Sequence, residues 1–194
     1  MLLVVAVLAY VLLLRTRGPG EIPPAALAAA SAAGCGDLEQ PVVQDPSRAH
    51  LAPGEGFDYP SLPAAAGPHD ASPLPPDPHV YQRPVPETRA VHNLEHAYVL
   101  IYYRPTAEGG MSSDTIDALE RLAREQSRVI MAPYPSLPEG QALALVAWNT
   151  RWMCPADVTA AQAVTIAAGF VDAFRGTTVA PEPPRGLLGP LIQK

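Results

Sequence analysis

Residues 98–103, Tyr-Val-Leu-Ile-Tyr-Tyr, are the stretch that decides the fold. The run is rich in β-branched and aromatic residues and stops before Pro105, which predicts a β-strand. It is apolar almost without a break, so we expect a central strand that is covered on both faces. The rest of the chain must therefore supply two covering layers.

The residues after this strand predict two helices and two further strands. A helix is expected over about 113–128, short strands over 129–132 and 142–149, and a last helix over about 159–174, with Gly176 where a helix commonly ends. The order strand, helix, strand, strand, helix indicates an α+β fold. In this fold the two helices pack on a small mixed β-sheet.

The residues before the strand have a different character. The chain has 194 residues, and fifteen of its 24 prolines lie before residue 87. Proline lacks a backbone N–H, so residues 35–90 are expected to form an irregular proline-rich arm. Residues 18–34 look like a flexible Ala/Pro tether, and residues 181–194 like a C-terminal tail. We therefore expect one α+β domain over 35–180, with the arm at its start.

Charge excludes nucleic acid as a partner. The net charge is −6 at pH 7, and Lys194 is the sole lysine. No stretch gathers the cationic side chains needed to neutralise several phosphates. An acidic balance of this size favours solubility and says little about a substrate.

The first residues predict attachment to a membrane. Residues 1–14, MLLVVAVLAYVLLL, are apolar without a break, and Arg15 and Arg17 follow them. A helix of this length covers roughly 21 Å, which is short of a ~30 Å hydrocarbon core and suits the apolar part of a signal peptide. A signal peptide begins with basic residues, and none stand before this run. We therefore expect the native chain to carry further basic residues before Met1.

We interpret residues 1–17 as a single-pass N-terminal membrane anchor, with the domain on the extracytoplasmic side of the cell membrane. A cleaved signal segment, with cleavage in the Ala-rich residues 25–34, is the second interpretation, and a buried core helix is the third. The two arginines that follow the apolar run, taken alone, would instead place the domain on the cytoplasmic side.

Cys35 and Cys154 are the only cysteines of the chain. In an exported protein such a lone pair favours a disulfide, whereas a cytosolic protein more often uses it for metal binding or catalysis. We predict a Cys35–Cys154 disulfide that holds the start of the arm against the C-terminal half. Two unrelated structural thiols are the alternative.

The five histidines all lie between residues 50 and 96 and are absent from the 98 residues that follow. Imidazole is the commonest neutral metal ligand, and its second nitrogen lets a neighbouring group fix the ring. Asp70 adjoins His69, and Glu95 adjoins His96, which would place carboxylates beside two of the rings. This clustering is the main functional signal of the sequence.

Residues 92–96, His-Asn-Leu-Glu-His, match the H-x-x-E-H pattern of inverted zinc peptidases. That chemistry requires a helix, so that His92 and His96 share a face and Glu95 acts as a base on zinc-bound water. An extended segment would separate the two histidines by roughly 13 Å, too far to share one metal ion. The third ligand would be a carboxylate on a later helix, for which the sequence offers Glu120 and Glu125.

Three stretches together resemble a known family. They are AHLAPGEGFDYPSLPAAAGPH (49–69), YQRPVPETRAVHNLEHAYVLIYYRP (81–105) and RWMCP (151–155), preceded by Cys35. The arrangement is similar to the bacterial family called domain of unknown function 3105, over roughly residues 35–176. The sequence departs from the family pattern at Ala65-Ala66, where the family has Thr-Ser, at Leu62-Pro63, which replaces paired prolines, and at Ala97, where it has Gly.

The resemblance implies one membrane helix and an extracytoplasmic domain. It also separates His79, which lies outside the family pattern, from the other four histidines. We therefore expect a transition metal, copper or zinc, to be bound by the four patterned residues, because imidazole suits both ions and no Asp/Glu cage for calcium is visible. The expected ligands are His50, His69, His92 and His96, supported by Glu95 and Asp70. A protein partner in the cell envelope would remain to be identified.

Two other interpretations stay open. The first is a non-catalytic structural or interaction module, whose five imidazoles lie apart and each hydrogen-bond the arm onto the sheet. The second is the zinc-dependent hydrolase that the H-x-x-E-H pattern suggests. We expect binding rather than catalysis.

Overall fold

A computed structural model describes residues 18–184 of the chain. The expected membrane anchor, residues 1–17, lies outside the described residues, as do residues 185–194 of the expected tail. Among the described residues, no helix combines the length and the apolar character that a bilayer crossing requires.

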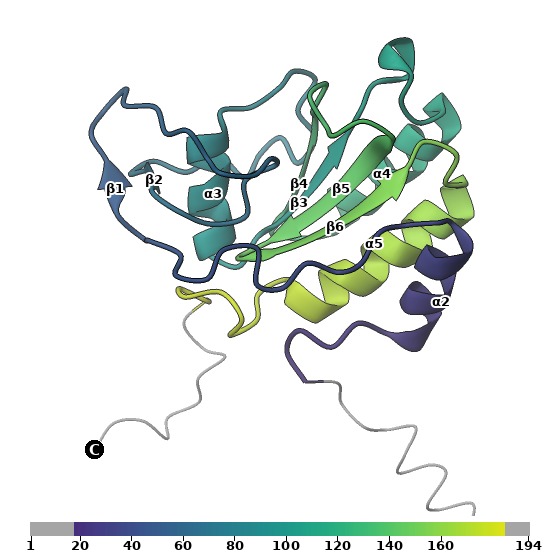
Figure 1. Cartoon of the computed structure of the whole chain (residues 1–194), viewed down its shortest axis with the longest axis horizontal. Coiled ribbons are helices and arrows are strands. Elements are labelled where there is room, and N and C mark those ends of the chain that lie inside the picture. Colours follow the sequence, from purple (N-terminus) through teal and green to yellow (C-terminus); the bar gives the residue numbers. More distant parts are fainter. Residues whose placement is uncertain (1–17, 185–194) are drawn as a thin grey trace, which may run out of the picture.

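A four-stranded mixed sheet forms the centre of the molecule (Figure 1). Its strand order is β4-β3-β5-β6, with β4 parallel to β3, and with β5 antiparallel to both β3 and β6. The strands are β3 (Val99–Tyr103), β4 (Val129–Pro133), β5 (Gln141–Ala147) and β6 (Thr150–Pro155). The expected small mixed sheet is confirmed, and β6 is the strand that the sequence analysis missed.

The central strand β3 is buried on both faces, as its continuous apolar run predicts. Val99 and Ile101 pack into one hydrophobic core, and Leu100 and Tyr102 pack into a second core on the opposite side of the sheet. All five residues of the strand are buried. The alternation of side chains along the strand therefore divides the protein into three layers.

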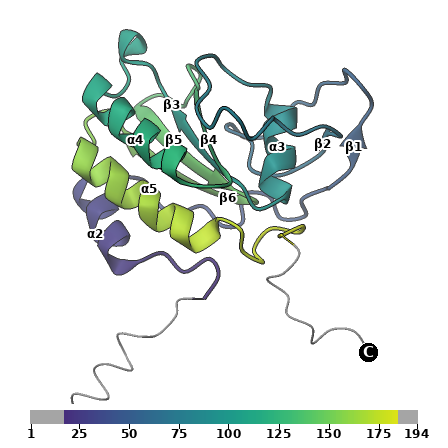
Figure 2. The same cartoon turned by 180° about the vertical axis from the view of Figure 1, so that it is seen from behind.

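Three helices lie on one side of the sheet, where the later two contact the strands and the first packs against the last (Figure 2). They are α2 (Pro24–Ala32), α4 (Ser113–Glu125) and α5 (Ala160–Phe174). Helix α4 begins after Ser112, whose hydroxyl accepts the N–H of Thr115, and α5 begins with a capping box made by Thr159 and Gln162. These side chains satisfy backbone N–H groups that each first turn leaves unpaired.

Helix α2 corrects the expectation of a flexible tether over residues 18–34. Ala26 and Ala30 of α2 are buried against α5, and a side chain at Gly169 of α5 would collide with Ala26. Alanine has the highest helix propensity, and small residues on both helices let their backbones approach closely. The tether prediction treated Ala-rich composition as flexible, whereas burial makes this segment part of the fold.

The expected disulfide joins Cys35, just after α2, to Cys154 in β6. Close by, the indole Nε1 of Trp152 donates to the carbonyl oxygen of Gly36 at 2.9 Å. Further along the arm, Glu39 pairs with Arg151 of β6 through a backbone bridge and through a 2.7 Å ion pair. The start of the arm is thus fixed along the β6 edge of the sheet.

The opposite face of the sheet is covered by the proline-rich arm and by α3 (Glu87–Glu95). Within the arm, β1 (His50–Leu51) and β2 (His69–Asp70) form a short parallel pair beside α3 (Figure 1). The remainder of the arm is irregular, as expected, yet residues such as Ala65 and Leu74 are buried in the second core. The irregular backbone of the arm is therefore packed as part of the fold.

The start of the expected C-terminal tail also belongs to the fold. The backbone N–H of Glu182 donates to the carbonyl oxygen of Glu95 at 3.0 Å, which attaches residues 181–184 to the end of α3. The last carbonyl groups of a helix lack intrahelical partners, and this contact satisfies one of them. The tail prediction is therefore wrong for these four residues.

Candidate metal centre

Helix α3 carries two of the expected ligands on one face. His92 and His96 are one helical turn apart, and their Nε2 atoms lie 3.0 Å from each other. The helix ends directly after Glu95, and Ala97 takes a left-handed backbone conformation with φ of 61°. The helix that the H-x-x-E-H pattern requires is present.

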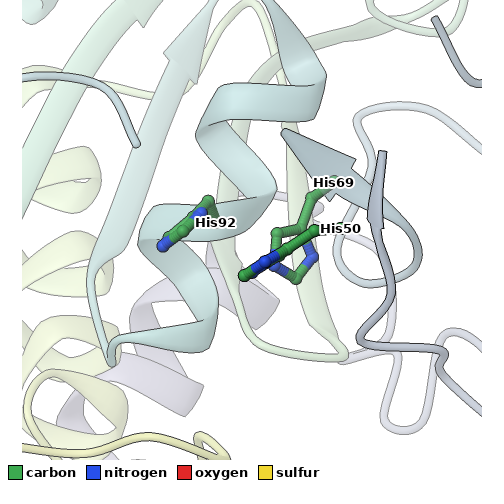
Figure 3. A group of neighbouring side chains, drawn as sticks. All are labelled: His50, His69 and His92. Atoms are coloured by element: carbon green, nitrogen blue, oxygen red, sulfur yellow. The ribbon is translucent and has the colours of Figure 1, made fainter. Parts of the chain in front are cut away.

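The β1–β2 pair brings two further histidines to the same place. His50 and His69 are partners in the strand register, and their ring centroids are 5.1 Å apart. The ring of His92 lies 5.4 Å from that of His50, 5.1 Å from that of His69 and 4.9 Å from that of His96. Figure 3 shows the three side chains of His50, His69 and His92 between α3 and the strand pair. We call these four residues the histidine cluster.

Backbone carbonyls fix the tautomers of two rings in the cluster. Nδ1 of His69 lies 2.9 Å from the carbonyl oxygen of Gly67, and Nδ1 of His92 lies 2.7 Å from that of Asp70. A carbonyl oxygen only accepts hydrogen bonds, so both Nδ1 atoms carry the proton. The lone pair of each neutral ring is therefore on Nε2, which is the arrangement that metal-binding histidines show.

The Nε2 atom of His69 is buried without a hydrogen-bond partner among the described residues. Oε2 of Glu95 lies 3.0 Å away, which is within ion-pair distance, although the two atoms form no hydrogen bond. A lone pair that faces a carboxylate oxygen is unfavourable unless a cation lies nearby or a proton is added. The side chain of His69 is 0% exposed, so bulk water does not relieve this contact.

Glu95 lies between the histidine cluster and the guanidinium group of Arg48. Its buried carboxylate contacts His69 on one side and Arg48 on the other, with Oε1 3.7 Å from the Arg48 guanidinium. Arg48 also pairs with Glu182 at 3.8 Å, and Glu182 in turn lies 3.6 Å from Nδ1 of His96. Arg48 and Glu182 were not predicted, since no local pattern connects them to residues 92–96.

Asp70 contributes through its backbone. Its carbonyl oxygen holds the ring of His92, whereas its carboxylate accepts the N–H of Ser72 at 2.7 Å. The position of Asp70 next to His69 in the sequence predicted that its carboxylate lies beside a ring. The parallel β1–β2 pairing instead directs the Asp70 carbonyl towards α3.

Burial lowers the pKa of His92 below its usual value, and the neighbouring rings of His96, His69 and His50 lower it further. The contact between Nδ1 and the Asp70 carbonyl opposes this effect, because it stabilises the protonated ring. The net direction favours the neutral imidazole. The neutral form is the one that binds a metal ion.

The fifth histidine and the expected third peptidase ligands lie elsewhere. His79 directs Nδ1 to the carbonyl oxygen of Val129 at 2.9 Å, beside β4. Glu120 pairs with Arg124 on α4, which covers the other face of the sheet. The carboxylates near the histidine cluster are instead Glu95 and Glu182.

Ligand atoms of His50, His69 and His92 all lie within 4.8 Å of one another, and so do those of Glu95, His96 and Glu182. Tetrahedral zinc bound to nitrogen at 2.0–2.1 Å places its ligands roughly 3.3 Å apart. The 3.0 Å between the Nε2 atoms of His92 and His96 is close to that spacing. The buried His69 Nε2 and the donor set therefore fit a transition-metal ion.

The family model described as Protein of unknown function (DUF3105) matches residues 50–185, which is more than half of the chain. The chain belongs to this family. The DUF3105 region begins at His50 and contains the complete histidine cluster, together with Glu95 and Glu182. Neither the curated proteins nor the solved structures include a match to the chain. The DUF3105 description names no activity, so the geometry of the site is the evidence for its function.

Proposed function

We propose that this DUF3105 protein binds a divalent transition metal, zinc or copper, through His50, His69, His92 and His96. The observation that carries the proposal is the pair of fixed tautomers at His69 and His92, whose Nδ1–H groups are held by backbone carbonyls. Both rings thereby offer Nε2 lone pairs within one cluster. A histidine that binds a metal almost always donates its other ring N–H to such an acceptor, whereas a surface histidine has no need to.

A purely structural role explains the cluster less well. In such a role each imidazole would have its own hydrogen-bond partners, and a buried nitrogen left without one costs about 1–3 kcal/mol. The Nε2 atom of His69 is such a nitrogen. A metal ion would use its lone pair and would also screen it from the Glu95 carboxylate 3.0 Å away.

The donor set favours zinc or copper(II) over copper(I). Copper(I) prefers thioether and thiolate ligands, whereas imidazole and carboxylate suit the divalent ions. Met111 and Met131 are buried in the core on the opposite face of the sheet, Met153 packs against the second core, and both cysteines are joined in a disulfide. His50 is exposed, so its ring can rotate towards the other three as the ion binds.

Metal loading of the purified protein tests this proposal. The protein is stripped with a chelator, loaded separately with Zn²⁺ and Cu²⁺, desalted and measured by inductively coupled plasma mass spectrometry. We expect about one ion per chain, and its loss in the double variant His92→Ala/His96→Ala. His79→Ala is the matched control, because His79 lies outside the cluster. Absence of metal in the parent protein, or equal loading in the double variant, would refute the proposal.

A zinc-dependent hydrolase is the second candidate, because His92, Glu95 and His96 lie on and directly after a helix. It ranks lower because the Glu95 carboxylate is buried between His69 and Arg48, whereas a general base must reach the metal-bound water. Hydrolysis of a peptide library by the zinc-loaded protein, abolished in Glu95→Gln with zinc retained, would favour this candidate. Equal turnover by the parent and the variant would exclude it.

We also propose that the domain is held at the extracytoplasmic face of a cell membrane by residues 1–17. The support is the apolar run of residues 1–14 and a disulfide, which persists in oxidising compartments. Expression in a bacterial host, followed by membrane fractionation and protease treatment of spheroplasts, tests the location. Recovery of the protein in the soluble fraction, or protection from the protease, would contradict it.

A further inference from the structure

A cavity of about 790 Å³ lies beside the histidine cluster, at the end of α3. Its volume is in the range of sites for small molecules. His96 and Glu182 belong both to the wall of the cavity and to the surroundings of the cluster. A molecule in the cavity would therefore lie next to the proposed metal ion.

An apolar part makes up slightly more than half of the cavity wall. It is formed by Leu74 and by prolines of two separate segments, which are Pro73, Pro76, Pro181, Pro183 and Pro184. The amide of Asn93, also in the wall, is already used, because it exchanges hydrogen bonds of 2.8 and 3.0 Å with the backbone of Leu74. This part of the wall thus suits an apolar molecular body.

Arg128 is the single arginine in this wall, and it is held in place. Its Nη1 donates to the carbonyl oxygen of His96 at 3.2 Å, and its guanidinium lies 5.4 Å from the ring centroid of Tyr98. Within residues 18–184, no carboxylate lies within 4.0 Å of the Arg128 guanidinium, whereas Glu182 is paired with Arg48 and His96. A positioned guanidinium with unused N–H donors recognises a carboxylate.

We infer that this cavity binds a small organic carboxylate, whose anionic group is held by Arg128 and whose apolar body lies against the proline wall. The position of this ligand beside a metal ion rests on the proposed function. The contact with Arg128 does not depend on it.

Titration with benzoate tests the inference, and benzamide serves as the neutral probe of equal shape. Binding is followed by NMR chemical shifts and by calorimetry on the full protein, in metal-free and zinc-loaded forms. We expect benzoate to bind at least tenfold more tightly than benzamide. We also expect Arg128→Gln to weaken benzoate binding at least tenfold, and Arg128→Lys to restore part of it. Arg124→Gln, which removes the same charge from α4 on the other face, should have no effect.

The metal content of each sample is measured in parallel, which separates the two proposals. Benzoate binding that depends on Arg128 in a protein that takes up neither Zn²⁺ nor Cu²⁺ would support the cavity assignment and refute the proposed function. Zinc uptake with equal affinities for benzoate and benzamide would overturn the cavity assignment alone. Unchanged benzoate affinity in a folded Arg128→Gln protein, as judged by circular dichroism, would overturn it as well.

Discussion

The Nε2 atoms of His92 and His96 lie 3.0 Å apart, on side chains separated by one turn of α3. Nδ1 of His92 donates to the Asp70 carbonyl, so its Nε2 carries a lone pair when the ring is neutral. Nε2 of His96 therefore either donates an N–H group to this lone pair or binds the same cation as Nε2 of His92. The other nitrogen of His96, Nδ1, lies 3.6 Å from the carboxylate of Glu182.

Substitution of Glu95 by Gln is expected to weaken metal binding by about tenfold to a hundredfold, because it removes the negative charge that faces Nε2 of His69 and would attract a cation bound there. The buried carboxylate lies 3.0 Å from Nε2 of His69 and is the nearest negative charge to the cluster. Competition with a zinc-selective dye measures the change in Kd. Glu120→Gln on α4 is the matched control, and a loss of equal size in that variant would contradict the prediction.

Removal of the disulfide by a Cys35→Ser/Cys154→Ser double substitution should lower the free energy of unfolding by about 2–5 kcal/mol. The bond closes a loop of 119 residues and attaches the segment after α2 to β6. Urea unfolding followed by circular dichroism measures the loss. The parent protein treated with a reductant should show a similar decrease, and unchanged stability in both samples would argue against this role.

The buried carboxyl group of Glu87 predicts that the free energy of unfolding falls as the pH rises. Burial raises the pKa of its carboxyl group above the usual value of 4.5, although the Ala64 N–H and the Tyr134 hydroxyl both donate to it. The folded protein thus favours the protonated form, so this group's contribution to stability is present below pH 4.5 and is lost as the pH rises through the raised pKa. Glutamine keeps an acceptor for both donors and carries no charge.

The Glu87→Gln variant should therefore gain stability relative to the parent between pH 4.5 and pH 8. Urea unfolding of both proteins at several pH values in this interval measures the difference, and the exposed Glu139→Gln variant is the control. A difference between parent and Glu87→Gln that stays constant with pH would be inconsistent with a raised pKa.

Substitution of Ala97 by glycine is expected to leave the stability of the protein nearly unchanged, whereas substitution by valine is expected to lower it. Its φ of 61° is unfavourable for residues with a side chain by about 1–2 kcal/mol, whereas its buried methyl group contributes about 0.8 kcal/mol. Ala97→Gly should therefore change the free energy of unfolding by less than about 1 kcal/mol. Ala97→Val should lower it by about 2–4 kcal/mol, because the site is both left-handed and fully packed. Thermal unfolding of the two variants gives the comparison.

Local patterns in the sequence determined three strands of the central sheet and two of the helices that cover it. The continuous apolar run at 98–103 indicated a strand with two covered faces, and the helices at 113–125 and 160–174 follow from periodicity and from end signals. These features depend on neighbours within a few residues. Strand β6 was missed because it follows β5 after a two-residue turn and begins with the polar residues Thr150 and Arg151, which break the apolar run.

The histidine cluster was expected from residue types, but its geometry depends on contacts between distant segments. His50, His69 and His92 come together only through the β1–β2 register and the packing of α3. Arg128 and Glu182 had no signal in the sequence, because each reaches the site from a segment far from the histidines, and Arg48, two residues before His50, meets Glu95 only in the folded chain.

The sequence by itself thus determined the central strand of the sheet. It also determined the reactive groups that are available, which are the imidazoles and a pair of cysteines. The tertiary structure decided which nitrogen of each ring is free, since backbone carbonyls at Gly67 and Asp70 set the tautomers. It also decided that an alanine-rich tether is a packed helix. Composition describes single residues, whereas burial and hydrogen-bond partners are properties of how segments meet.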